Sequence, residues 1–135
     1  MSSPYEGEMA IDTEYDIVMA RKAVRTAAVA LGFGVTDVTR IVTAASELTR
    51  NIYLYAGSGI MRWHPVSGNF AGLELVFEDQ GPGIADMTRA MQPGFSSGNG
   101  LGMGLPGSKR LMDEMDIVSE IGKGTSVRIR KWLRR

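Results

Sequence analysis

The chain has 135 residues, with 15 basic and 15 acidic side chains, one histidine and no cysteine. This length suits one domain with a buried core, so we expect a single domain over residues 1–135. The balanced charge argues against nucleic acid or a membrane as partner, and the lack of cysteine excludes a disulfide framework and a thiolate metal site. No segment resembles a secretion signal or a membrane span, so a cytoplasmic protein is expected.

The N-terminal segment predicts a short strand followed by a helix. Residues 8–11 suit a strand, and Thr13 with Asp16 has the spacing of a capping box that starts a helix. The next glycines, Gly32 and Gly34, are expected to end this helix, because glycine readily adopts the backbone conformation that follows a last helical turn.

The second predicted helix carries the first candidate site residues. Thr36 is expected to cap it, and it should run to about Ala56 along one apolar stripe. The stripe consists of Val38, Ile41, Ala45, Leu48, Ile52 and Tyr55. At roughly 100° per residue, Glu47 and Asn51 lie about 40° apart at the edge of that stripe. Both side chains therefore face a boundary between core and solvent, although this spacing is also that of an ordinary solvated helix face.

The remaining elements are two strand pairs with one helix between them. Residues 60–64 and 72–78 read as strands joined by the turn-rich segment 65–69, and residues 117–121 and 126–133 as a closing pair. Helical spacing is shared by Leu105, Leu111, Met112 and Met115. The expected fold is an α/β (α+β) two-layer sandwich, with a mixed, mainly antiparallel sheet covered on one face by helices.

Asp79 stands at an unusual place in the predicted sheet. It continues the inward-facing side of a strand formed by Leu73, Leu75 and Phe77. A carboxylate on that face needs a hydrogen-bond donor, and the exocyclic amino group of adenine would be a suitable one. Alternatively the strand ends at Glu78, and Asp79 only opens the Gly-Pro-Gly turn that follows.

A second glycine-rich segment precedes the last predicted helix. Gly100, Gly102 and Gly104 offer bare backbone amides and the positive end of a helix dipole, which together favour phosphate. With Gly107 the segment also fits the dinucleotide pattern G-x-G-x-x-G, but that fingerprint needs a preceding strand, and the polar residues 95–99 do not form one. A plain flexible loop is the alternative.

Three further side chains suit phosphate chemistry. Mg2+ prefers oxygen ligands and keeps several waters, so the amide oxygen of Asn51 together with phosphate oxygens would suffice. Glu47, one turn earlier, could orient or deprotonate an attacking hydroxyl. Thr125 shares a strand face with Val127 and Ile129, so its hydroxyl can reach inward, although a role in the turn is equally open.

Together these pieces resemble, in the right order, the motifs of the GHKL (Bergerat-fold) superfamily of ATPases and kinases, which includes gyrase, Hsp chaperone ATPases, sensor histidine kinases and MutL. Glu47 and Asn51 resemble its N box, Asp79, Gly81 and Gly83 its first glycine box, Gly100, Gly102 and Gly104 its second, and Gly122, Gly124 and Thr125 its third. The resemblance covers nearly the whole chain. It implies ATP and Mg2+ as cofactors, Asp79 as the residue that reads adenine, and a lid over about residues 91–99.

Within this superfamily the chain looks most like small bacterial switch-protein kinases and anti-sigma factors, through residues 46–57, 78–84 and 104–114. The resemblance to such kinases implies ATP-dependent phosphorylation of serine or threonine on STAS-domain stressosome proteins of the RsbS and RsbR type. It also implies that the kinase then activates an RsbU-type phosphatase in the general stress response. Anti-sigma factors of the RsbW type usually carry histidine at the position of Tyr55, and gyrase-type ATPases aspartate at that of Arg50. Both differences favour a kinase over an anti-sigma-like binding protein or a stand-alone ATPase. The oligomeric state stays open.

Overall fold

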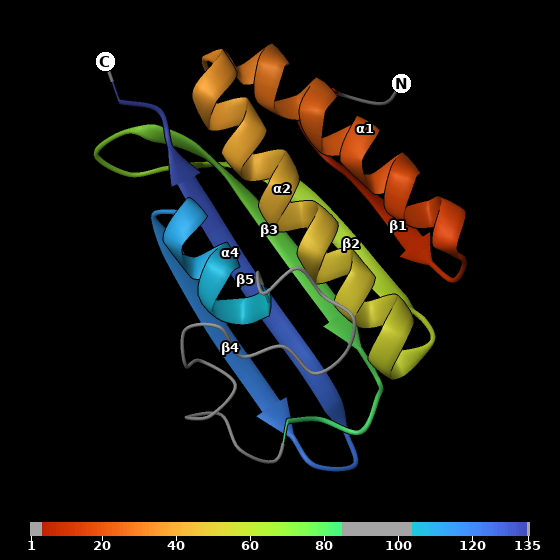
Figure 1. Ribbon diagram of the computed structural model, residues 1–135. Helices are drawn as coiled ribbons and strands as arrows, with labels where there is room; N and C mark the ends of the chain where they lie inside the picture. The colour runs from red at the N-terminus through yellow and green to blue at the C-terminus, as the bar shows by residue number, and fades with distance from the viewer. Residues whose placement is uncertain (1–3, 85–103, 135) are drawn as a thin grey trace.

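The computed structural model describes residues 4–84 and 104–134. Its elements are β1 (Gly7–Ile11), α1 (Glu14–Leu31), α2 (Val35–Asn51), the π-helix η1 (Ile52–Ala56), β2 (Gly59–Ser67), β3 (Ala71–Asp79), α4 (Gly104–Leu111), β4 (Glu114–Glu120) and β5 (Gly124–Trp132). The strands form one sheet in the order β1-β2-β3-β5-β4, and each neighbouring pair is antiparallel. Figure 1 shows α1, α2 and α4 on one face of the sheet, as expected for a two-layer sandwich. Of the helices in these two described ranges, none has the length and apolar character to cross a membrane.

The start and end of α1 follow the predicted local signals. The backbone N–H of Asp16 donates to the Thr13 hydroxyl at 3.3 Å, and the backbone N–H of Thr13 donates to the Asp16 carboxylate at 3.0 Å. Hydrogen bonds from the backbone N–H groups of Asp12 and Thr13 lower the pKa of Asp16. Gly32, at φ 100°, ends the helix. The capping box and the glycine stop are therefore confirmed.

The start of α2 differs from the prediction that Thr36 caps it. Val35 is already helical, and Gly34 occupies the capping position with no side chain to accept a hydrogen bond. The Gly34 carbonyl accepts the N–H of Val38 at 2.9 Å instead. Because the chain has already turned at Gly32, α2 can begin at Val35, one residue before the predicted cap Thr36.

The end of the helix also differs, because α2 changes into the π-helix η1. The N–H of Gly57 donates to the carbonyl of Ile52 at 2.9 Å, a bond that spans five residues rather than the four of an α-helix. The extra residue turns Tyr55 away from the buried stripe: its exposed fraction is 43%, against 2% for Ile52. The prediction that Tyr55 continues the stripe was therefore wrong.

The strand β2 continues through a proline that was predicted to lie in a loop. It reaches Ser67, and Pro65 pairs with Leu73 of β3. On its other side β2 pairs with β1, which begins at Gly7 opposite Trp63, so no β1 residue lies beside Pro65. Proline lacks an N–H donor and is tolerated in a strand where no neighbour needs one.

The last helix is shorter than its apolar spacing predicted. α4 ends at Leu111, and Met115 belongs to β4, where it pairs with Ile129. Met115 packs against the core from the strand. An apolar residue four positions after Leu111 suits either a helix or an inward-facing strand position, so spacing alone could not separate the two.

The sheet face without helices carries a network of charges. Glu74 is 6% exposed, and its carboxylate accepts from Arg130 Nε at 2.5 Å and lies 2.6 Å from His64 Nε2. Arg128 lies between Glu74 and Asp116, and the hydrogen bond to Asp116 raises its pKa. β5 is an inner strand of the sheet, and its arginines Arg128 and Arg130 pair with acidic residues of β3 and β4 across this face.

Candidate functional site

One cross-strand row at the end of the sheet is made of small and polar residues. In it, Asp79 of β3 pairs with Gly59 of β2 and with Thr125 of β5, and Thr125 pairs with Ser119 of β4. The next row on the same, helix-covered face is apolar and consists of Met61, Phe77, Val127 and Ile117. The inward face of the sheet thus changes from apolar to polar within one row, and Asp79 and Thr125 lie side by side there.

The structure confirms that Asp79 continues the inward face of β3, so the strand does not end at Glu78, while contact with adenine stays a prediction. Asp79 is the last residue of β3, on the inward face, and its Oδ1 accepts the backbone N–H of Gly81 at 2.9 Å, which shapes the following turn. A Cβ at Gly59 would lie 2.7 Å from Ile52 Cγ2 and 3.3 Å from the Cβ of Asp79. Gly59, opposite Asp79, is therefore required by the close packing of β2 against β3 and η1.

Gly81 and Gly83 allow the chain after β3 to pass between two neighbours. A Cβ at Gly81 would lie 2.7 Å from the Cβ of Ala56 in η1, and a Cβ at Gly83 would lie 2.5 Å from the carbonyl oxygen of Glu120 at the end of β4. Gly83 also has φ 80°. These two glycines are required by packing of the protein on itself, while contact with a nucleotide stays a prediction.

The third glycine segment holds β5 against the end of β3. Gly122 has φ 79° with no heavy atom within 4 Å of its added Cβ, so it serves the turn. Gly124 has φ 116°, and a Cβ there would overlap the backbone of Asp79. Only a glycine at position 124 allows this close approach, which brings the backbone of β5 against Asp79 next to Thr125.

Ser119 is a member of this site that sequence reasoning missed. Its Oγ lies 2.9 Å from Thr125 Oγ1 and accepts the backbone N–H of Ile84 at 2.7 Å. It thereby joins the end of the first glycine segment to the third. The signal that could have found it is the register of the β4–β5 hairpin, which places position 119 opposite Thr125.

Glu47 and Asn51 lie in the last part of α2, which reaches the polar row. Glu47 is 6% exposed, and its Oε1 accepts from Arg50 Nη1 at 3.0 Å. Arg50 was not predicted as a partner, although a spacing of three along a helix allows it. Asn51, the last residue of α2, is half-buried. In Figure 1 this end of α2 lies beside the end of β3, and packing of Ile52 next to Gly59 fixes it there.

The second glycine segment is described only from its last member. α4 begins at Gly104, as predicted. Gly100, Gly102 and the proposed lid over residues 91–99 lie outside the described residues.

The far end of α4 is held by a buried lysine. Lys131 is 8% exposed on β5, and its Nζ donates to the carbonyl oxygen of Leu111, the last residue of α4, at 2.9 Å. Asp113 and Asp37 lie 3.8 and 3.7 Å from the same ammonium. A cation at a helix C-terminus satisfies unpaired carbonyls and the helix dipole, so Lys131 fixes the orientation of the helix whose N-terminus begins at Gly104.

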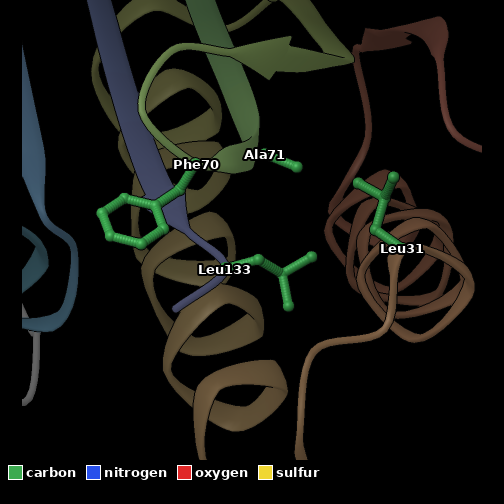
Figure 2. Close-up of a pocket in the computed structure, with 4 residues that line it drawn as sticks. All are labelled: Leu31, Phe70, Ala71 and Leu133. Atoms are coloured by element: carbon green, nitrogen blue, oxygen red, sulfur yellow. The ribbon is translucent and has the colours of Figure 1, made fainter. Parts of the chain in front are cut away.

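A separate apolar hollow of about 320 Å³ lies at the opposite end of the sheet. Figure 2 shows its lining, Leu31, Phe70, Ala71 and Leu133, at the start of β3 and beyond the end of β5. None of these four side chains is polar, so the hollow does not suit a triphosphate. The candidate nucleotide site is therefore the polar row at the other end.

The donor set at the polar row suits magnesium held mainly by a nucleotide. Over residues 4–84 and 104–134 no group of three or more histidine, cysteine, aspartate or glutamate side chains could hold a metal. Mg2+ typically takes one or two protein oxygens together with phosphate oxygens and waters. The half-buried amide of Asn51, near the carboxylate of Glu47, fits that pattern.

A polar sheet end under a helix C-terminus, bordered by glycine turns, is the part of this fold that suits a nucleotide. Residues 36–135 match the family described as histidine kinase-, DNA gyrase B-, and HSP90-like ATPase, and the chain belongs to this family. It is 54% identical over 125 residues to the serine/threonine-protein kinase RsbT of Bacillus subtilis (strain 168), which covers 92% of this chain and 94% of that protein.

The chain is also similar to an anti-sigma factor and to one solved structure of the same fold. The chain is 34% identical over 121 residues to the anti-sigma F factor of Thermoanaerobacter sp. (strain X514), covering 84% of this chain and 83% of that protein. The structure of the RsbU and RsbW domains of Rv1364c from Mycobacterium tuberculosis superposes with a TM-score of 0.66 at 19% identity, over 96% of this chain and 33% of that longer chain, and shows the fold alone. The family match and the identity to RsbT confirm the expected class, an ATP-dependent serine/threonine-protein kinase.

Proposed function

We propose that the chain transfers the γ-phosphate of ATP to a serine or threonine hydroxyl on STAS-domain proteins of the RsbS and RsbR type, in the bacterial cytoplasm. After the transfer the kinase leaves its substrate and activates an RsbU-type phosphatase. The observation that carries this proposal is the 54% identity to the kinase RsbT over nearly the full length of both chains.

The nucleotide would lie between the end of α2 and the polar row of the sheet. The carboxylate of Asp79 would accept a hydrogen bond from the adenine amino group beside the turn that it shapes. The N-terminus of α4 at Gly104, with Gly100 and Gly102 before it, would bind the phosphates through backbone amides and the helix dipole. Gly81 and Gly83 would place backbone beside the nucleotide, and the Thr125 hydroxyl would add a donor.

The end of α2 would carry the transfer chemistry. The amide oxygen of Asn51 would be the protein ligand of Mg2+, which supplies charge neutralisation on the phosphates when bound. Glu47 would accept the proton of the acceptor hydroxyl as it attacks the terminal phosphate. Its ion pair with Arg50 holds the carboxylate in one orientation, so the base is positioned before the acceptor arrives.

These roles predict different effects of two substitutions. Glu47→Ala should abolish transfer from labelled ATP to an RsbS-type protein and leave nucleotide affinity, measured by calorimetry, within about threefold of the wild type. Asp79→Asn should weaken Mg-ATP binding by about tenfold or more, because an amide cannot accept the same pair of hydrogen bonds as a carboxylate. Asp116→Asn makes the same change on the opposite sheet face and should leave both quantities unaltered. Full phosphorylation by both site variants would contradict the roles.

A second candidate function is an anti-sigma-like binding protein that uses nucleotide to shape a surface. The 34% identity to an anti-sigma F factor favours it. The two candidates give different results: an anti-sigma-like protein would retain a sigma factor in a pull-down with Mg-ATP, whereas a kinase would leave a STAS protein phosphorylated after incubation with labelled ATP. Retention of a sigma factor without phosphate transfer would replace the kinase proposal.

A further inference from the structure

The π-helix η1 exposes two large apolar side chains in succession. Leu54 is 51% exposed and Tyr55 43%, while Ile52 in the same turn is 2% exposed. An α-helical continuation would place Tyr55, three residues after Ile52, on the buried stripe. The bond from Gly57 to Ile52 closes a wider turn and brings the ring to the surface. Such π segments are frequently found at functional sites.

This exposed pair lies at the rim of the candidate site. Ile52, at the start of η1, packs beside Gly59 opposite Asp79, and Ala56, at its end, packs beside Gly81. Leu54 follows Glu47 by seven residues, which is roughly 10 Å along a helix axis. A protein that brings a hydroxyl group to Glu47 therefore comes within side-chain reach of η1.

We propose that Leu54 and Tyr55 are the docking surface for the protein acceptor of the phosphoryl transfer. This inference rests on the proposed function, because it takes Glu47 as the place where the acceptor hydroxyl arrives. The occupant presents an apolar side chain close to its serine or threonine and covers the leucine and the tyrosine ring. A protein interface typically depends on a few such apolar and aromatic residues, with tyrosine prominent among them.

An exposed apolar residue at the start of α2 provides a matched control. Val35 is 85% exposed at the first turn of α2, and Leu54 lies nineteen residues further along, roughly 28 Å away along a continuous helix. A serine at either position removes an exposed apolar side chain, so both variants are expected to fold equally well. Only one of them lies beside the candidate site.

The test compares steady-state phosphorylation of an RsbS-type STAS protein by the wild type and by Leu54→Ser, Tyr55→Ser, Leu54→Met and Val35→Ser. We expect the two η1 serine variants to raise the KM for the acceptor protein by about tenfold or more. Their affinity for Mg-ATP in calorimetry should stay within about twofold, and their melting temperature should change by no more than about 2 °C. Leu54→Met and Val35→Ser should behave like the wild type.

Each other outcome overturns the inference in a recognisable way. An unchanged acceptor KM in both η1 serine variants overturns the docking surface and leaves the proposed function intact. An equal rise of the acceptor KM in Val35→Ser would show that the effect is not specific to η1. A loss of Mg-ATP affinity in the η1 variants would show that Leu54 and Tyr55 support the nucleotide site instead of docking the acceptor. If the wild type does not phosphorylate the STAS protein at all, the proposed function fails and this inference fails with it.

Discussion

Replacing Gly124 with alanine should disturb the candidate site far more than the same change at Gly122, two residues earlier. Both glycines have positive φ, 116° and 79°. A Cβ at Gly122 meets no heavy atom within 4 Å, whereas at Gly124 it would lie 2.9 Å from both the carbonyl carbon of Asp79 and the Cα of Gln80, and closer still to the carbonyl oxygen of Asp79. These neighbours are backbone atoms, so relief requires the strands to separate.

The two substitutions share one energetic term and differ in another. A side chain at positive φ costs about 1–2 kcal/mol in either variant. Overlap with fixed neighbours adds about 1–3 kcal/mol at Gly124 alone. We therefore expect losses in the free energy of unfolding of about 1–2 kcal/mol for Gly122→Ala and about 2–5 kcal/mol for Gly124→Ala. For a chain of this length each kcal/mol lowers the melting temperature by about 3–5 °C.

Urea unfolding of both variants measures these losses, and calorimetry with Mg-ATP measures the consequence for the site. Gly124→Ala should weaken nucleotide binding because the overlap moves Asp79 away from Thr125. Gly122→Ala should bind nucleotide like the wild type, because its strain stays in the turn. Equal loss of stability in the two variants, or unaltered binding by Gly124→Ala, would refute the close approach of β3 and β5.

Three further changes test the supports of the site. Lys131→Met removes the ammonium that caps α4. We expect the free energy of unfolding in urea to fall by about 1–3 kcal/mol and hydrogen exchange in α4 to become faster. Unaltered exchange in α4 would contradict the cap. Asp16→Asn should lower the melting temperature at pH 7. Because backbone donors lower the pKa of Asp16, its carboxylate stabilises the fold above its ordinary pKa of about 4 and loses this effect as the pH falls through the lowered pKa. The difference in melting temperature should therefore shrink as the pH falls below about 4, and a difference that stays constant would contradict this role. Ser119→Ala leaves the N–H of Ile84 without its acceptor, and a cost of about 1 kcal/mol is expected in urea unfolding; no cost would show that water replaces it.

The features that sequence predicted well depend on short stretches of chain. Thr13 and Asp16 form the capping box because both partners lie within one helical turn. Gly32 ends the helix by its own backbone conformation. The inward position of Asp79 follows from the alternation of side chains along one strand.

The features that sequence missed depend on neighbours that are distant in the chain. The π turn at η1 brings Ala56 against Gly81, a contact between segments that apolar periodicity cannot describe. Pro65 stays in β2 because β1 begins too late to lie beside it. Ser119 is an exception in distance, because its partner Thr125 is only six residues away, but it too depends on the pairing of two strands, β4 and β5. Apolar periodicity predicts which face of a single helix or strand is buried, whereas these positions depend on how two elements pair or pack.

The central claim is that the end of α2, the polar row of the sheet and the glycine turns together bind one Mg-ATP. Calorimetric titration of the wild type with Mg-ATP, alongside Asp79→Asn and Asp116→Asn, tests this most directly. The account predicts saturable binding with one nucleotide per chain, about tenfold or more weaker in Asp79→Asn and unaltered in Asp116→Asn. Absence of binding by the wild type, or equal affinity in all three proteins, would contradict it.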